Sequence, residues 1–324
     1  MNQTNQHELP LPMAGVEFRR QQIEQAVEKH RLLSMELEMT SACNLRCIYC
    51  YSAAGAACEG ELSHEEILGA ACQGIELGAQ KIVLLGGGEP CCYSRLRELI
   101  AAIRGMDCGV ELFTNGTLLD DDLAEFLYEQ QVAVVVKRNS DRPAVQDYLA
   151  GVPGTYDRVV EGWDCLFRAG YPGEAGLGVQ TVICNQNLDE IPELWRWARR
   201  RGIHPYFETV TQQGRSLDFP SLEISREQAA QVFDLLSRID RQEFGRCWIP
   251  KPPLAGAVCD RHRYSVLVKA NGQVWPCVGV SIPVGDIRQD RLEDLIRESK
   301  VIQDLRHAHQ RVRGACGSCE HVEG

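Results

Sequence analysis

Strand-like and helix-like segments alternate six times along this chain, beginning at residue 34. The expected strands are short, apolar and rich in β-branched residues, as in residues 81–85 (KIVLL) and 132–136 (VAVVV). Continuous apolar runs of this kind are typical of parallel strands that helices cover on the outside. We expect strands near residues 34–40, 81–86, 109–114, 132–138, 177–184 and 203–210, and helices near residues 63–78, 94–104, 118–130, 155–169, 188–201 and 225–238.

This alternation predicts an α/β fold. Six strand–helix units suggest a partial (βα)6 TIM-like barrel, in which polar side chains at the carboxyl ends of the strands meet in one site. The alternation stops at the proline-rich residues 250–253 (PKPP), which mark a domain boundary. We therefore divide the chain into a tail and helix at 1–33, the barrel at 34–240 and a small α+β domain at 241–324.

Three cysteines follow the first expected strand directly, with the spacing C-x3-C-x2-C. They are Cys43, Cys47 and Cys50. Thiolates suit iron–sulfur clusters and other soft metals. Three protein ligands would leave one iron of a cubane open, and an open metal position is where a substrate or cofactor binds. The alternative is a set of buried thiols or a disulfide loop.

Four more cysteines lie near the C-terminal end of the sequence. Cys259 and Cys277 flank the dipeptide at 271–272 (NG), whose turn chemistry predicts a hairpin that brings the two cysteines together. A C-x2-C pair at 316–319 follows an expected helix near 291–306. Four cysteines can complete a closed tetrathiolate site, and on its own this pattern fits structural zinc as well as an iron–sulfur cluster.

Composition restricts the compartment and the partners. The 324 residues include 15 cysteines, but no apolar run approaches the ~20 residues that span a bilayer, and the polar N-terminal segment lacks a signal-peptide core. We therefore expect metal ligands rather than disulfides, in a reducing, oxygen-poor cytoplasm. The net charge of −11, with no basic face, argues against nucleic acid as a partner, and the absence of a long apolar run argues against a membrane.

The first cysteine loop, with Tyr49 as the aromatic residue in C-x3-C-x-aromatic-C, resembles the motif of the radical S-adenosylmethionine (SAM) superfamily. The pattern C-x12-G-x4-C followed by C-x2-C resembles the SPASM/Twitch extension of these enzymes, so the two resemblances together cover residues 34–324. Because only five residues follow the last cysteine, we expect the shorter Twitch form with one auxiliary [4Fe-4S] cluster. The implied ligands are Cys43, Cys47 and Cys50 for the first cluster, and Cys259, Cys277, Cys316 and Cys319 for the auxiliary cluster.

The resemblance implies that the open iron of the first [4Fe-4S] cluster chelates the amino and carboxylate groups of SAM. One electron then cleaves SAM, and the resulting 5′-deoxyadenosyl radical takes a hydrogen atom from the substrate. Residues 87–89 (GGE) match the motif that holds the amino end of SAM, whereas a tight glycine turn is the alternative.

Further contacts to SAM are implied at the other strand ends. Asn115 lies in a Thr-Asn-Gly segment, for which an Asx-type turn is the alternative. Lys137 and Asn139 depart from the family pattern, since relatives often carry a serine and an aspartate there that face the ribose. Asn187 ends the fifth strand, and capping of the next helix is its other expected role. The full implied set for SAM is Tyr49, Gly87, Gly88, Glu89, Asn115, Asn139, Ser140 and Asn187.

Three charged residues are candidates for catalysis or substrate binding. Lys137 would need an anionic partner inside the barrel, either the carboxylate of SAM or a substrate group. Glu208 could bind an amine or a hydroxyl group or move a proton, and Arg215 could bind a carboxylate or a phosphate. An ion pair at the barrel rim is the alternative for Glu208 and Arg215.

We therefore expect an enzyme that takes hydrogen from a small-molecule substrate, with the auxiliary cluster carrying an electron in an oxidation or a rearrangement. A reduced flavodoxin- or ferredoxin-type protein would supply electrons. Whether the enzyme is an oxidoreductase, an isomerase or a lyase stays open. Modification of a peptide is the alternative, disfavoured because no separate leader-binding domain precedes Cys43. A non-catalytic iron–sulfur or zinc protein is the alternative from another class.

Overall fold

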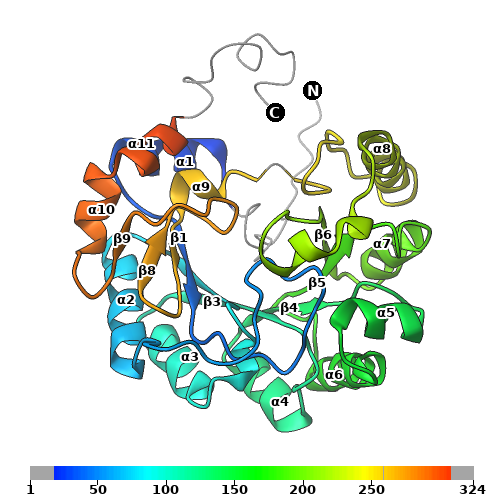
Figure 1. Cartoon of the computed structure of the whole chain (residues 1–324), viewed down its shortest axis with the longest axis horizontal. Helices are drawn as coiled ribbons and strands as arrows, with labels where there is room; N and C mark the ends of the chain where they lie inside the picture. The colour runs from blue at the N-terminus through cyan, green and yellow to red at the C-terminus, as the bar shows by residue number, and fades with distance from the viewer. Residues whose placement is uncertain (1–17, 258, 308–324) are drawn as a thin grey trace.

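The computed structural model describes residues 18–257 and 259–307 of this chain. One sheet of nine strands, in the order β6-β5-β4-β3-β2-β1-β7-β8-β9, forms its centre. Strands β1 to β6 run parallel, and the helices that connect them lie around the outside of the curved sheet (Figure 1). The expected partial (βα)6 barrel is confirmed.

The elements have the following bounds. The strands are β1 (Ser34–Glu38), β2 (Lys81–Leu85), β3 (Gly109–Thr114), β4 (Ala133–Lys137), β5 (Leu177–Ile183), β6 (His204–Thr209), β7 (Leu267–Val268), β8 (Gln273–Trp275) and β9 (Gly285–Asp286). The α-helices are α1 (Arg20–Glu28), α2 (His64–Glu76), α3 (Leu96–Gly105), α4 (Asp121–Glu129), α5 (Pro143–Ala150), α6 (Thr155–Ala169), α7 (Ile191–Arg200), α8 (Arg226–Glu243), α9 (Arg261–Tyr264), α10 (Leu292–Glu298) and α11 (Lys300–Arg306). Short 3-10 helices are η1 (Pro90–Cys92), η2 (Gly214–Asp218) and η3 (Pro220–Leu222).

Strand β1 shows how the barrel is filled. Its alternate residues Met35 and Leu37 belong to the main apolar core, which also contains residues of α2 and α3. Because successive side chains of a strand point to opposite faces, Glu36 and Glu38 face the barrel interior instead. Both glutamates are buried, so the interior of the barrel needs cations from elsewhere in the chain.

The six predicted barrel strands and the six helices predicted to follow them are all present. Their ends differ by a few residues from those expected. The structure adds α5, which we did not predict. The helix expected near 291–306 is two helices, because Ser299 ends α10 and its side chain caps α11 by accepting a hydrogen bond from the Ile302 amide. The helix expected within residues 1–33 is α1.

The C-terminal region continues the barrel sheet. Strands β7 and β8 pair antiparallel around Gly272, whose φ of 92° suits the predicted Asn-Gly turn. Strand β7 also pairs in parallel with β1, so that the sheet runs without a break from the barrel into the hairpin, which lies beside β1 in Figure 1. No helix in the described residues combines the length and the apolarity needed to cross a bilayer.

Candidate active site

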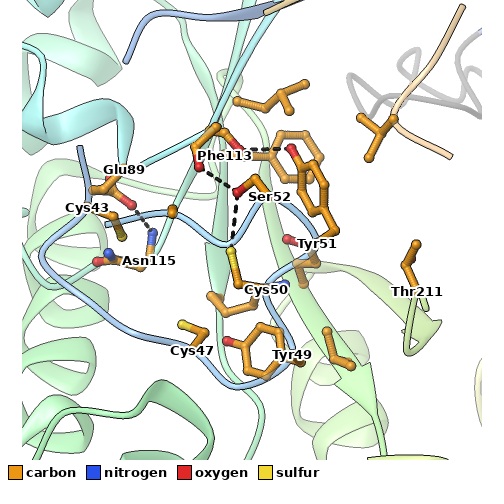
Figure 2. Close-up of a pocket in the computed structure, with 18 of the residues that line it drawn as sticks. Cys43, Cys47, Tyr49, Cys50, Tyr51, Ser52, Glu89, Phe113, Asn115 and Thr211 are labelled. Atoms are coloured by element: carbon orange, nitrogen blue, oxygen red, sulfur yellow. Dashed lines mark hydrogen bonds between the residues drawn. The ribbon is translucent and has the colours of Figure 1, made fainter. Parts of the chain in front are cut away.

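A cavity of about 190 Å³ lies at the carboxyl ends of the barrel strands. Its walls come from the loop after β1, from the ends of β2 to β6, and from Arg261 and Val278 of the C-terminal region. Figure 2 shows the cysteine loop crossing this cavity. The parallel arrangement of the strands therefore gathers most of the predicted site residues in one place.

Cys43, Cys47 and Cys50 all line the cavity. Burial raises the pKa of the Cys43 thiol to about 12 and that of the Cys47 thiol to about 11. Metal binding must therefore displace protons from these thiols. Among the described residues, no three His, Cys, Asp or Glu side chains close on a single metal ion. Three thiols on one loop are the donor set for an iron–sulfur cluster that keeps one iron open, so the residues present fit this group.

The glycine-rich turn after β2 lies directly against the cysteine loop. The Gly88 amide donates to the Thr40 carbonyl at 2.7 Å, and the Glu89 amide donates to the Ala42 carbonyl at 2.8 Å. A Cβ atom on Gly88 would collide with the carbonyl oxygen of Ala42. The close approach of the two loops therefore requires glycine at this position.

Glu89 is a buried carboxylate in the cavity wall. Its Oε1 accepts hydrogen bonds from the Thr114 hydroxyl at 2.6 Å and the Cys91 amide at 3.1 Å. Its Oε2 accepts from the Asn115 amide at 2.8 Å, as Figure 2 shows. Burial raises the pKa of Glu89, and these hydrogen bonds oppose the shift. The carboxylate is thus held in one orientation, in which it can receive an ammonium group.

Asn115 and Tyr49 also line the cavity. Asn115 forms the expected Asx-type turn, since its Oδ1 accepts from the Thr117 amide at 2.9 Å. Its Nδ2 donates to Asn44 in the cysteine loop at 2.9 Å. Asn115 therefore forms this turn and also lines the cavity.

Asn139, Ser140 and Asn187 are buried, and they are not among the residues that line this cavity. Asn139 donates to the Tyr49 hydroxyl at 2.8 Å, and Ser140 donates to Glu190 at 2.6 Å. The amide of Asn187 bonds backbone groups at the ends of β4 and β5. Its expected helix-capping role is wrong, because Glu190 occupies the N-cap of α7. Contacts from these three residues to SAM stay predictions.

Lys137 and Glu208 face the same cavity. Gln180 donates to Glu208 Oε1 at 2.6 Å, and Lys137 Nζ lies 5.2 Å from the centre of the Tyr49 ring. Burial lowers the pKa of Lys137, while the negative charge of Glu208 opposes that shift. The ion pairs found among the described residues include none for Lys137 or Glu208, so both charges remain available to a ligand.

Arg215 lies outside the cavity wall. Its guanidinium group donates to the carbonyls of Cys47 at 2.8 Å and Ala54 at 2.6 Å, on the cysteine loop. The alternative reading, a rim ion pair, is not found for Glu208 or Arg215 among the described residues; Glu208 accepts from Gln180, and Arg215 donates to backbone carbonyls. Its role as a ligand for a substrate anion stays a prediction.

Tyr206 and Arg261 line the cavity but were not predicted. Arg261 Nη1 donates to Glu36 Oε1 at 2.7 Å, and its Nη2 donates to the Tyr206 hydroxyl. The signal for this cluster was the pair of glutamates, Glu36 and Glu38, in the first expected strand, since buried carboxylates need cationic partners. The partner could not be identified because it lies 225 residues away in the sequence.

The C-terminal cysteines are described only in part. Cys259 and Cys277 are half-buried, whereas Cys316 and Cys319 lie outside the described residues. Burial raises the pKa of Cys277 to about 11, and negative charge on Glu36 and Cys259 adds to the effect. The two cysteines therefore lie close enough to influence each other electrostatically, next to the barrel interior.

Comparison with known proteins assigns the barrel and the C-terminal region each to a known family of domains. Residues 37–198 match the radical SAM superfamily, and residues 259–320 match SPASM, an iron–sulfur cluster-binding domain. Mycofactocin maturase MftC of Mycobacterium tuberculosis is 28% identical over 304 residues, which cover 88% of this chain and 75% of MftC. The AdoMet-dependent heme synthase of Methanosarcina barkeri is 27% identical over 325 residues, which cover 90% of this chain and 88% of that enzyme.

Solved structures show the same fold. Streptococcus suis SuiB bound to S-adenosylmethionine superposes with a TM-score of 0.67 at 16% identity, over 94% of this chain and 75% of SuiB. The cofactors of this chain are accordingly a [4Fe-4S] cluster with SAM and auxiliary iron–sulfur chemistry in the SPASM domain. This chain belongs to the radical SAM superfamily and is an enzyme with a C-terminal SPASM domain.

Proposed function

We propose that this enzyme uses SAM to remove a hydrogen atom from a small metabolite bound in the barrel cavity. One observation carries the proposal: the three thiols of the cysteine loop and the charged groups of Lys137 and Glu208 share one cavity. When bound, the cluster and SAM supply an electron and a 5′-deoxyadenosyl radical. The chain itself must bind these groups, orient the substrate and exclude water.

Each wall of the cavity has a separate task in this proposal. Cys43, Cys47 and Cys50 hold the cluster. Glu89 accepts hydrogen bonds from the ammonium group of SAM, because its carboxylate is fixed by three donors and faces the cavity. The glycines before Glu89 let SAM approach the backbone closely.

Lys137 and Glu208 offer opposite charges to the remaining ligand groups. Lys137 binds a carboxylate, of SAM or of the substrate, since a buried ammonium group gains most from an anionic partner. Gln180 occupies one oxygen of Glu208 and leaves the other for an amine or a hydroxyl group of the substrate. Phe113, Val182 and Val278 supply apolar cavity surface that excludes water.

The C-terminal cysteines complete the proposal. Cys259, Cys277, Cys316 and Cys319 would bind one auxiliary cluster entirely through protein ligands, which leaves it no open site for substrate. Its task is then electron transfer. Loss of an electron from the substrate gives an oxidation, and its return gives a rearrangement.

Peptide modification is a second candidate, which two of the named relatives favour. MftC is a mycofactocin maturase, and SkfB of Bacillus subtilis, 23% identical over 289 residues, is a sporulation killing factor maturation protein. The heme synthase of M. barkeri, in contrast, fits a small-molecule substrate. Relatives of similar identity thus divide between the two substrate classes.

Anaerobic incubation of the reconstituted full chain with SAM and dithionite tests the reaction. We expect 5′-deoxyadenosine and methionine by mass spectrometry, and neither from the Cys47→Ala variant. Intact SAM beside a well-formed cluster would instead favour an electron carrier.

A low-molecular-mass cell extract then separates the two substrate classes. Stimulation of 5′-deoxyadenosine formation that survives protease treatment of the extract supports a metabolite. Stimulation that protease abolishes supports a peptide.

A further inference from the structure

Arg215, which follows the last barrel strand, forms hydrogen bonds that hold the cysteine loop after the first barrel strand in place. It lies on η2, just after β6, and its backbone amide donates to the Cys50 carbonyl at 2.9 Å. Its Nη1 donates to the Cys47 carbonyl at 2.8 Å and its Nη2 to the Ala54 carbonyl at 2.6 Å. One residue thus holds three carbonyls of a loop that lies more than 160 residues earlier in the sequence.

The turn that carries Arg215 is itself fixed against the loop. Gly214 has a φ of 58°, and a Cβ atom there would collide with the Tyr51 carbonyl. The buried Ser216 hydroxyl bonds the carbonyls of Thr211 at 2.7 Å and Gln213 at 2.8 Å. Because the turn is closely packed and internally bonded, Arg215 presents its guanidinium group in one orientation.

The charge of Arg215 is not neutralised by a carboxylate in the described contacts. Its side-chain hydrogen bonds go to peptide carbonyls, which carry no net charge, and it is half-buried. The positive charge therefore stays beside Cys47 and Cys50. Nearby charges, hydrogen bonds and exposure to solvent set the reduction potential of an iron–sulfur cluster. A fixed cation favours the state with one more electron.

We propose that Arg215 is a positioning residue for the catalytic cluster, which fixes the backbone of Cys47 and Cys50 and raises the reduction potential of the cluster. The same turn follows the end of β6, where Glu208 and Thr211 line the cavity. Arg215 thereby connects the substrate side of the barrel to the cluster loop. The inference rests on the proposed function, in that Cys43, Cys47 and Cys50 are taken as the ligands.

An EPR-monitored redox titration of the reconstituted full chain tests this role. The signal to follow is the one that changes when SAM is added, because that response marks the catalytic cluster. For Arg215→Met we expect the ratio of reduced to oxidised cluster at a fixed potential to fall at least tenfold, equivalent to 59 mV for one electron. For Arg215→Lys we expect most of this loss to be recovered, because the charge is kept.

Arg46→Met is the matched control. Arg46 also donates to carbonyls of the cysteine loop, those of Cys43 and Leu45 at 2.7 Å each, but its side chain is exposed. Solvent screens such a charge, so we expect a ratio within threefold of the unsubstituted enzyme. A shift in Arg46→Met as large as that in Arg215→Met would contradict a specific role for Arg215.

Two further results would overturn the proposal. One is an assembled cluster in Arg215→Met with the potential of the unsubstituted enzyme. The other is a potential in Arg215→Lys that is lowered as far as that in Arg215→Met, since lysine preserves the charge. Loss of the SAM-responsive cluster from Arg215→Met with recovery in Arg215→Lys supports it. The ligand set is tested separately: a SAM-responsive cluster that persists in Cys47→Ala would refute the proposed function, whatever Arg215 does.

Discussion

The cysteine loop at 43–50 and the C-terminal pair Cys259 and Cys277 border the same barrel interior, but they reach it in different ways. The first loop takes its three cysteines from one short segment, and it is held by backbone hydrogen bonds, such as that of the Ile48 amide to the Leu149 carbonyl, and by the Arg215 side chain. Of the second pair, Cys277 directly follows the hairpin that extends the barrel sheet, whereas Cys259 lies before α9. A short motif therefore encodes the first site, whereas the second depends on the assembled fold.

Buried charges join the second region to the barrel. Arg261 pairs with Glu36 at 2.7 Å, and Lys269 lies 3.6 Å from Glu38. Both glutamates are on β1, directly before the cysteine loop. The C-terminal region thus supplies the cations that pair with the two β1 glutamates, and the two regions share one electrostatic network.

Removal of one ligand from the first site should have the largest effect. For Cys47→Ala we expect formation of 5′-deoxyadenosine to fall at least about 1,000-fold, because no electron can then reach SAM. The auxiliary cluster should remain, since its ligands lie elsewhere. Iron analysis and mass spectrometry measure both quantities. Cys72→Ala on α2 is the control, and equal loss of iron from both variants would contradict the assignment.

Breaking the buried ion pair should destabilise the junction of the two regions. Glu36→Gln or Arg261→Met should each lower the free energy of unfolding by about 3–5 kcal/mol, because the remaining charge is buried without its partner. The double variant should lose less than the sum of the two single variants. Urea denaturation followed by circular dichroism measures this. Strictly additive losses would show that the pair is not coupled.

Glu89→Gln should weaken SAM binding without disturbing the second region. We expect about 10- to 100-fold lower affinity, since a hydrogen bond to a charged group contributes about 1.5–3 kcal/mol. Titration of the reconstituted enzyme with SAM, followed by EPR, gives the affinity. Glu98→Gln on the exposed face of α3 is the control. An unchanged affinity in Glu89→Gln would remove Glu89 from the SAM site.

Lys269→Met should have the smallest effect, and that effect should depend on pH. Burial raises the pKa of Glu38, and the charge of Lys269 opposes this shift. Without Lys269 we expect a loss of about 1 kcal/mol of stability at pH 8. The loss should fade as the pH falls through the raised pKa, because protonated Glu38 needs no cation. A loss that grows toward low pH would contradict this reading of the pair.

The parts of the site that the sequence predicted are those encoded by neighbouring residues. Cys43, Cys47 and Cys50 were recognisable because their spacing is itself the signal, and residues 87–89 because glycine and glutamate follow a strand end. All of them line the cavity. All six barrel strands were likewise predicted, most clearly β2 and β4, whose apolar runs are nearly continuous and covered by helices on the outside.

Contacts between distant segments escaped prediction. No local pattern connects Arg261 to Glu36 or Arg215 to Cys47, because each pair is brought together only by closure of the barrel. Helix α5 was missed for a different reason. It begins at Pro143 after a polar stretch, and proline at the first turn of a helix resembles a loop signal in sequence alone.

The most direct test of the account is a spectroscopic measurement on the Cys259→Ala/Cys277→Ala double variant. Mössbauer and EPR spectra of the reconstituted protein, recorded with and without SAM, report whether the cysteine loop at 43–50 holds its own cluster. We expect one cubane whose spectrum changes when SAM binds. A variant that retains iron but whose spectra do not change with SAM would contradict the central claim that three thiols leave one iron open to SAM.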